Sequence, residues 1–265
     1  MTDILSVITS NKRLEIKSLY SDPRRQENLV KLAGEIKRIP LSFSSFINDK
    51  NEKGLNGIIS EFKRRSPSKG DIAPSASVIP VVDEYQKGGA AACSILTDTR
   101  FFGGSIYDLS VARASLEIPI LRKDFIIDPI QIYEAFVAGA DCILLIASIL
   151  SKAEIKLLTS TAHDLGMEIL FEVHTLEEID KYIPGIEMIG VNNRKLSTFQ
   201  TDLSHSHSMM QYLPSEPLKI AESGIKNEED IKILRNVGYN GFLIGETLMK
   251  SGDIQDTLKS FCNAH

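Results

Sequence analysis

The segment PILRKDFIIDPIQIYEAFVAGADCILLI, residues 119–146, has the pattern of a strand, a helix and a second strand. Its first apolar run, 119–123, is short and continuous, and the run at 141–146 repeats this pattern. Between them, residues 129–138 have the spacing of an amphipathic helix. Continuous apolar runs are typical of strands that are buried on both faces, as in a parallel sheet. The segment therefore predicts a β-α-β unit.

The same unit recurs along most of the chain. Eight short apolar runs are predicted to be strands: 57–63, 91–96, 119–123, 141–146, 167–172, 187–192, 218–223 and 241–246. The longer segments after them are predicted to be helices: 75–87, 106–115, 129–138, 152–165, 176–182, 204–212, 227–236 and 252–262. Eight such units in 265 residues indicate a closed (β/α)8 TIM barrel, with 1–265 as a single domain. A doubly wound open sheet is the alternative, but the G-x-G-x-x-G turn typical of that fold does not occur here.

Residues 1–50 precede this pattern and have a different character. They are polar and charged, with apolar residues such as Ile4, Ile8 and Ile16 at helical intervals. We therefore expect a helical N-terminal extension of two or three amphipathic helices.

The composition excludes several classes of protein. Hydrophobic residues make up 43% and charged residues 25%, which are ordinary values for a globular protein. The net charge is −5 and no basic stripe is visible, which argues against a nucleic-acid partner. The N-terminus does not resemble a secretory signal, and no apolar run approaches the ~20 residues that span a bilayer. The cysteines, Cys93, Cys142 and Cys262, are far apart and odd in number, so we expect reduced thiols and a cytoplasmic protein.

Polar and charged residues stand at the ends of several predicted strands. They are Glu61 and Lys63, Lys123, Glu172, Asn192 and Glu222. A single polar residue at a strand end usually marks the point where the chain meets solvent. In a barrel, however, strand ends at the same height surround one mouth, where the active sites of this fold lie. The joint pattern therefore predicts that these six side chains converge on one site.

Three consecutive charges, Arg122, Lys123 and Asp124, follow the apolar part of the third strand. Because side chains alternate along a strand, Lys123 is predicted to point into the barrel and Arg122 towards the helices or solvent. Asp124 would begin the loop and tether Lys123. A carboxylate nearby would keep the ammonium charged, whereas burial and a second ammonium would lower its pKa. We expect this lowering to make Lys123 a general acid near neutral pH.

Two further segments indicate a ligand with a phosphate and an aromatic ring. Gly224 follows the seventh predicted strand and Gly245 stands at the end of the eighth, where barrels of this type often bind phosphate through backbone N–H groups. Arg194 and the stretch RRSPSKG (64–70) strengthen this prediction. The two Phe residues of LTDTRFFGGS (96–105) either pack on the barrel rim or form an apolar wall for a substrate ring. The five histidines lack metal-ligand spacing, so no metal site is predicted.

Several motifs resemble one enzyme family closely. IISEFKRRSPSKGDI, SILTDTRFFGGS, PILRKDFIID, IGVNNRKLSTFQTDL, IAESGI and FLIGETLM, together spanning about Gly57 to Met249, are similar to indole-3-glycerol phosphate synthase of tryptophan biosynthesis. The resemblance implies a phosphate-binding (β/α)8 barrel with the helical extension over its mouth, and no cofactor. It also implies ring closure of 1-(2-carboxyphenylamino)-1-deoxyribulose 5-phosphate, with loss of carbon dioxide and water.

The resemblance implies a role for each candidate residue. Lys123 would be the general acid that protonates the substrate carbonyl, and Glu172 and Lys63 would act in the dehydration, their acid and base roles being left open. Glu61 would support that proton transfer, and Asn192 and Glu222 would bind a substrate hydroxyl and position Lys123. The phosphate would be bound by Ser66, Arg194, Ser223, Gly224, Gly245 and the backbone amide of Glu246. The anthranilate ring would lie against Phe102, Phe125 and Leu196.

Two other functions fit the fold. The neighbouring barrel phosphoribosylanthranilate isomerase is expected to use a Cys and an Asp at strand ends, but here the first strand ends in Glu61 and Lys63. A non-catalytic barrel that binds phosphate-bearing ligands or proteins would have an incomplete Lys and Glu set, and all six positions are occupied. We therefore expect a small anionic phosphate ester as the partner, and a monomer or weak homo-oligomer without membrane contact.

Overall fold

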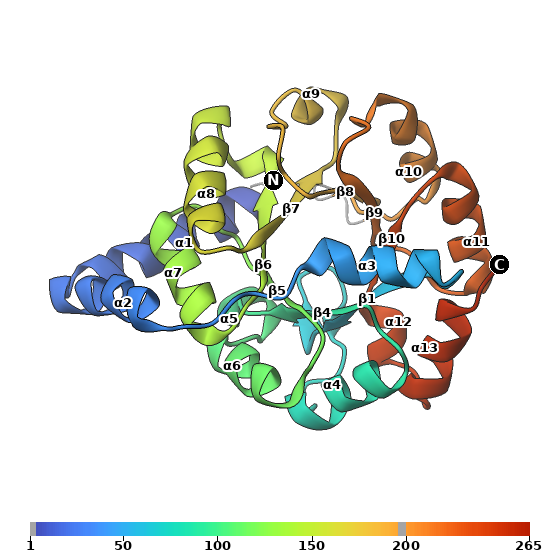
Figure 1. The fold of residues 1–265 in the computed structure, drawn as a ribbon, viewed down its shortest axis with the longest axis horizontal. Helices are drawn as coiled ribbons and strands as arrows, with labels where there is room; N and C mark the ends of the chain where they lie inside the picture. Colours follow the sequence, from blue (N-terminus) through green and yellow to red (C-terminus); the bar gives the residue numbers. More distant parts are fainter. Residues whose placement is uncertain (1–3, 196–199) are drawn as a thin grey trace.

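The computed structural model describes residues 4–195 and 200–265, in which eight parallel strands close into a barrel (Figure 1). In chain order the strands are β1 (Gly57–Phe62), β4 (Ala92–Leu96), β5 (Ile120–Lys123), β6 (Cys142–Ile146), β7 (Glu168–Val173), β8 (Met188–Asn192), β9 (Leu218–Glu222) and β10 (Gly241–Ile244). The last strand, β10, pairs with β1 and closes the cylinder. The predicted (β/α)8 TIM barrel is confirmed.

Helices surround the strands (Figure 1). They are α4 (Val78–Lys87), α6 (Ile106–Ser115), α7 (Pro129–Ala138), α8 (Lys152–Asp164), α9 (Leu176–Ile179), α10 (Ser204–Met209), α11 (Glu228–Val237) and α13 (Ile254–Cys262). The predicted bounds of α7 agree with the observed ones because both ends carry strong signals. Asp128 and Gln131 form a capping box around Pro129, and Gly139 ends the helix at φ 102°.

Short elements in the βα loops were not predicted. They are the hairpin of β2 (Arg65–Ser66) and β3 (Gly70–Asp71), the helices α5 (Thr99–Phe102) and α12 (Glu246–Met249), and the 3-10 turn η1 (Ala147–Ile149). The helix predicted for residues 204–212 is divided into α10 and the 3-10 turn η2 (Met210–Tyr212). The eighth strand was predicted to reach Glu246, but it ends at Ile244 because Gly245 caps α12. Glu246 therefore belongs to the first turn of a helix.

Side chains alternate between two apolar layers. Ile58, Ile143 and Ile169 point outward and pack with the helices in the larger core cluster. Ile59 and Leu144 belong to a second cluster that fills the inside of the barrel. This alternation sends the side chains of strand-end residues either into the barrel or behind it, as expected for a pleated strand.

The N-terminal extension forms three helices, α1 (Ile4–Tyr20), α2 (Pro23–Glu35) and α3 (Phe43–Glu52). Helix α1 lies at the mouth of the barrel, in agreement with the predicted helical extension over the mouth. Helix α3 crosses the opposite end (Figure 1), where a Cβ on Gly57, the first residue of β1, would lie 2.7 Å from Ile47 Cγ2. Ser44 N–H also donates to Glu168 at the start of β7, at 2.7 Å. The apolar side chains of α3 thus plug the end that the strands leave open.

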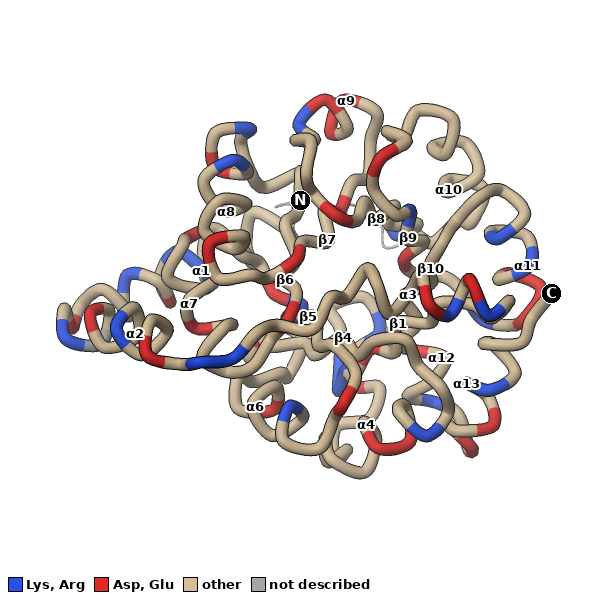
Figure 2. Tube along the Cα trace, viewed as in Figure 1, with Lys and Arg blue, Asp and Glu red and all other residues tan. Residues whose placement is uncertain are grey.

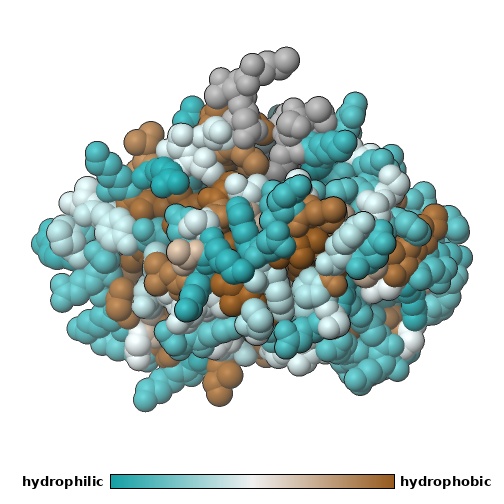
Figure 3. Space-filling view, turned by 90° about the horizontal axis from the view of Figure 1, so that it is seen from above, coloured by the Kyte–Doolittle hydropathy of each residue, from teal (hydrophilic) through white to brown (hydrophobic). Residues whose placement is uncertain are grey.

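Acidic and basic residues are interspersed over the outer helices (Figure 2). The face seen in Figure 3 is mostly hydrophilic, with hydrophobic groups visible between the charged side chains. None of the helices within 4–195 and 200–265 combines the length and the apolarity that crossing a membrane requires.

Candidate active site

A cavity of about 520 Å³ opens where the carboxyl ends of the strands meet, a volume suited to a small organic ligand. Among its lining residues are the six predicted catalytic ones: Glu61, Lys63, Lys123, Glu172, Asn192 and Glu222. The predicted phosphate ligands Ser66, Arg194, Ser223, Gly224, Gly245 and Glu246 line it too, as do Phe102 and Phe125. Leu196 lies outside the described residues. The structure therefore brings the described candidates together around one cavity.

Strand register explains why these side chains converge. Asn192 is paired with Glu222, and Glu172 is paired with Ile146 and Gly190, so residues far apart in sequence lie at the same height. Alternation then turns Lys123 inward and Arg122 outward. Arg122 is buried behind the barrel, where it donates to the Gln131 carbonyl and to Glu134. The predicted directions of both side chains are confirmed.

Lys123 lies at the centre of the charged group. Its ammonium is 3.0 Å from Glu172 Oε2 and 2.5 Å from Glu222 Oε2. Since β5 and β9 are separated by β6, β7 and β8 on one side of the ring, the contact with Glu222 crosses the barrel interior. Burial alone would lower the pKa of Lys123, but Glu172, Glu222 and Glu61 outweigh it and raise this pKa. The predicted lowering is wrong because Lys123 has acidic neighbours rather than a second ammonium: Lys63 pairs with Glu61 instead, at 2.5 Å.

The pKa values of the two acids beside Lys123 are shifted in opposite directions. Burial tends to raise the pKa of Glu172, but Lys123 and His174 outweigh it and lower this pKa to about 2. Burial raises the pKa of Glu222, and the Lys123 ammonium offsets only part of this rise. Glu172 raises the pKa further by repelling a second negative charge, and the result is a pKa of about 8. Glu172 is therefore the more readily ionised of the two acids, and Glu222 the one that more readily takes up a proton.

Two glycines make room for these acids. A Cβ on Gly190 would overlap Glu222 Oε1, and a Cβ on Gly245 would overlap Glu61 Oε1. Gly245 was predicted as a phosphate ligand, and its contact with Glu61 is an additional reason for glycine there. Gly190 was not predicted, because a glycine inside a strand gives no local sign of which side chain it accommodates.

Asp124 does not tether Lys123 as predicted. Its carboxylate contacts Arg122 at 3.1 Å, Lys12 at 2.9 Å and the Thr97 hydroxyl at 2.5 Å. Burial tends to raise the pKa of Asp124, but Arg122 and Lys12 outweigh it and lower this pKa to about 2. Asp124 therefore joins strand β5 to helix α1, which carries Lys12.

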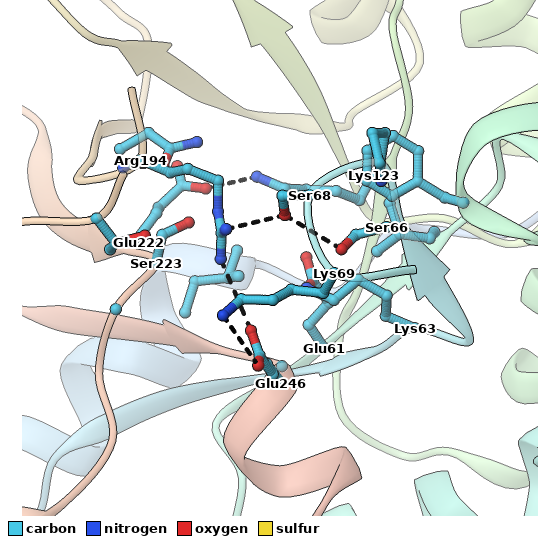
Figure 4. Close-up of a pocket in the computed structure, with 18 of the residues that line it drawn as sticks. Glu61, Lys63, Ser66, Ser68, Lys69, Lys123, Arg194, Glu222, Ser223 and Glu246 are labelled. Carbon is cyan, nitrogen blue, oxygen red and sulfur yellow. Dashed lines mark hydrogen bonds and ion pairs between the residues drawn. The ribbon is translucent and has the colours of Figure 1, made fainter. Parts of the chain in front are cut away.

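Another part of the cavity is rich in hydrogen-bond donors and cations. Arg194 donates to Ser68 Oγ at 2.9 Å, and Ser68 lies 3.3 Å from Ser66 (Figure 4). Beside them, Ser223 and Gly224 have φ values of 68° and 88°. A left-handed serine is uncommon and is often found where the backbone forms a binding site. Sequence reasoning included Ser68 and Lys69 only as part of RRSPSKG, and it missed Lys226 and Lys250.

The apolar part of the cavity lies beside β4 and β5. The rings of Phe102 and Phe125 are 6.0 Å apart at an angle of 39°. Leu5 and Ile8 of α1 also line the cavity, so the extension forms part of its wall. These two residues were missed because their helical spacing says nothing about where the helix docks.

Comparison with known proteins identifies the family. A family model described as indole-3-glycerol phosphate synthase matches residues 5–261. The chain belongs to the indole-3-glycerol phosphate synthase family. The indole-3-glycerol phosphate synthase of Bacteroides thetaiotaomicron is 45% identical over 269 residues, covering 100% of this chain and 99% of that protein. The one from Carboxydothermus hydrogenoformans is 45% identical over 82% of this chain and 83% of its own length. Indole-3-glycerol phosphate synthases are carboxy-lyases that catalyse a decarboxylative ring closure.

Solved structures with low sequence identity share the fold of this synthase family. Thiamine phosphate pyrophosphorylase from Pyrococcus furiosus has a TM-score of 0.56 at 17% identity, over 81% of this chain and 96% of that one. For 3-hexulose-6-phosphate synthase from Salmonella typhimurium, the TM-score is 0.61 at 11% identity, over 78% of this chain and 96% of that one. These similarities support the barrel and do not bear on the reaction.

Proposed function

We propose that the residues around Lys123 convert 1-(2-carboxyphenylamino)-1-deoxyribulose 5-phosphate to indole-3-glycerol phosphate. The observation that carries this proposal is the position of the Lys123 ammonium between Glu172 and Glu222 in a cavity with both aromatic and cationic walls. Phe102 and Phe125 would hold the anthranilate ring. Arg194, Ser66, Ser223 and the backbone at Gly224, Gly245 and Glu246 would hold the phosphate.

The two ends of the substrate fit the topology of the barrel. Phe102 and Phe125 follow β4 and β5, whereas Arg194, Ser223 and Gly245 follow β8, β9 and β10. These two groups of strands lie on different sides of the closed ring. A substrate bound at both ends would therefore pass over the inward-pointing side chain of Lys123, with its sugar carbonyl between the ring and the phosphate.

Lys123 would act as the general acid in ring closure. As the aromatic carbon attacks the carbonyl, negative charge develops on its oxygen, and a charged ammonium can stabilise that oxygen and then protonate it. The raised pKa of Lys123 ensures that the proton is present at neutral pH. Loss of carbon dioxide then restores the aromatic ring, and this step needs no electron-sink cofactor.

Glu172 and Lys63 would complete the reaction by removing water. Because Glu172 is ionised, we assign it the role of base, and Lys63, an amine held by Glu61, the role of acid for the leaving hydroxyl. Asn192 and Glu222 would bind a substrate hydroxyl. Glu222 would also keep the Lys123 ammonium directed at the carbonyl, since the two groups are 2.5 Å apart.

One assay tests this function. The purified protein, given the carboxyphenylamino deoxyribulose phosphate, is expected to form fluorescent indole-3-glycerol phosphate and release one carbon dioxide per product. Given phosphoribosylanthranilate instead, it is expected to form no isomerised product. Isomerisation without indole formation would contradict the proposal.

We also propose that residues 1–265 act as one domain that works in the cytoplasm as a monomer or weak homo-oligomer. The net charge of −5 and the interspersed charges of the outer helices support a protein without a nucleic-acid partner. Size-exclusion chromatography with light scattering measures the oligomeric state directly, and a tight oligomer would contradict this part of the proposal.

A further inference from the structure

The Glu246 side chain lies among three cations at the polar part of the cavity. Its carboxylate is 2.8 Å from Lys250 Nζ, 3.8 Å from Arg194 Nη2 and 3.9 Å from Lys69 Nζ. Figure 4 shows Arg194 and Lys69 extending towards it from two different loops. One carboxylate therefore balances cations from the loop after β8, the β2–β3 turn and the end of α12.

These contacts differ in strength and setting. Lys250 lies four residues after Glu246 on the same helical segment and is 52% exposed. Arg194 is only 18% exposed, and its guanidinium also donates to Ser68 inside the cavity. Lys250 is thus a partner that Glu246 keeps on its own helical segment, whereas Arg194 and the 49% exposed Lys69 come from other loops and are the cations that a bound anion would need.

A phosphate and a carboxylate require the same donors. Two anions held by one guanidinium repel each other, and the repulsion grows as the site is shielded from water. The phosphate ligands assigned above include Arg194 and the backbone amide of Glu246 itself. The Glu246 carboxylate consequently lies next to the position assigned to the substrate phosphate.

We propose that the Glu246 carboxylate competes with the substrate phosphate for Arg194 and Lys69, and thereby limits how tightly this enzyme holds phosphate esters. The inference rests on the phosphate site proposed above and adds a second role for Glu246, beside that of its backbone amide. When phosphate binds, Lys250 retains the carboxylate. Since indole-3-glycerol phosphate carries the same phosphate, the competition also weakens product binding and so favours product release.

Glu246→Gln tests the competition because it removes the charge and keeps the shape. We expect the inhibition constant of inorganic phosphate and the KM of the substrate to fall about three- to tenfold, as for the loss of partly exposed charge contacts. Glu246→Ser, which lacks both charge and length, should give the same direction of change. Asp256→Asn is the matched control, since it removes an exposed carboxylate paired with Lys259 on α13, outside the cavity.

A second variant separates this inference from the proposed phosphate site. Arg194→Ala is expected to raise both the KM and the inhibition constant of phosphate. If Arg194→Ala weakens phosphate and the Glu246 variants bind it no more tightly than the parent, Glu246 does not compete and the inference falls alone. If Arg194→Ala leaves phosphate inhibition unchanged, the phosphate site is wrongly placed and both proposals fall.

Discussion

Replacing Lys12 with methionine tests how helix α1 is held against the cavity. The Lys12 side chain is 5% exposed, and its ammonium lies 2.9 Å from Asp124 Oδ1 and 3.2 Å from Asp98 Oδ2. Both of these carboxylates are buried. Asp98 also caps α5, the helix that carries Phe102, through a 2.7 Å hydrogen bond from Phe101 N–H. Lys12 therefore links α1 to two neighbouring parts of the proposed substrate site.

The expected effect of Lys12→Met is large relative to what holds α1 in place. Removing one partner of a buried ion pair costs about 3–5 kcal/mol. Here the buried Asp98 would lose its ion pair with Lys12, whereas Asp124 would keep Arg122. Ile8 and Ile16, the buried apolar residues of α1, each contribute about 1.5–3 kcal/mol. The free energy lost with the ion pairs is thus similar to the free energy that burial of Ile8 and Ile16 contributes to holding α1 in place. Helix α1 should therefore detach while the barrel stays folded.

Hydrogen exchange and kinetics together measure this detachment. In Lys12→Met, the backbone amides of α1 should exchange about a hundredfold faster or more, and KM should rise because Leu5 and Ile8 leave the cavity wall. Lys17→Met is the matched control, since Lys17 is an exposed lysine of the same helix. If the variant retained the exchange rates of α1 and the KM of the parent protein, the ion pairs would not be what holds the helix.

Two further substitutions probe Glu222. The pKa of about 8 predicts that kcat/KM falls above pH 8, because the ionised Glu222 then holds the Lys123 proton more tightly. Glu222→Gln should abolish this decline. If the decline persisted in the variant, it would belong to another group. Because this pKa lies above the ordinary glutamate value of 4.5, the folded state binds an extra proton between these two pH values, and the free energy of unfolding should decrease as pH rises from about 4.5 to 8. Urea titrations of Glu222→Gln should show less of this decrease. In Gly190→Ala the new methyl group would displace Glu222, so kcat should fall at least about tenfold and the free energy of unfolding by about 1–3 kcal/mol. Kinetics and urea unfolding measure these two effects. Gly34→Ala is the control and should retain activity, because no atom lies within 4 Å of the added Cβ.

The barrel and most of its site could be predicted because both depend on local patterns. Strand alternation alone indicates that Lys123 and Arg122 face opposite ways, and the barrel fold indicates that Glu172 and Glu222 meet at the mouth. The bounds of α7 were predicted from its amphipathic spacing, and its capping box, contained within four residues, explains why the prediction agrees with the structure.

The features that could not be predicted depend on contacts between distant segments. The helical spacing of residues 4–20 does not show whether the helix docks at the mouth or elsewhere, and neither does that of 43–52. The pKa of Lys123 was predicted in the wrong direction, because the distances that separate it from Glu222 and Lys63 are set by the closed ring. The partners of Asp124 were missed for the same reason: Lys12 is far away in sequence.

The substitution Lys123→Met, measured for both turnover and product binding, tests the central claim most directly. Removal of a general acid is expected to reduce kcat by about 10²–10⁴-fold. The variant should still bind indole-3-glycerol phosphate, followed by its fluorescence, because Arg194 and the aromatic walls remain. Loss of turnover with product binding retained would support Lys123 as the acid of ring closure. Turnover close to that of the parent protein would contradict it.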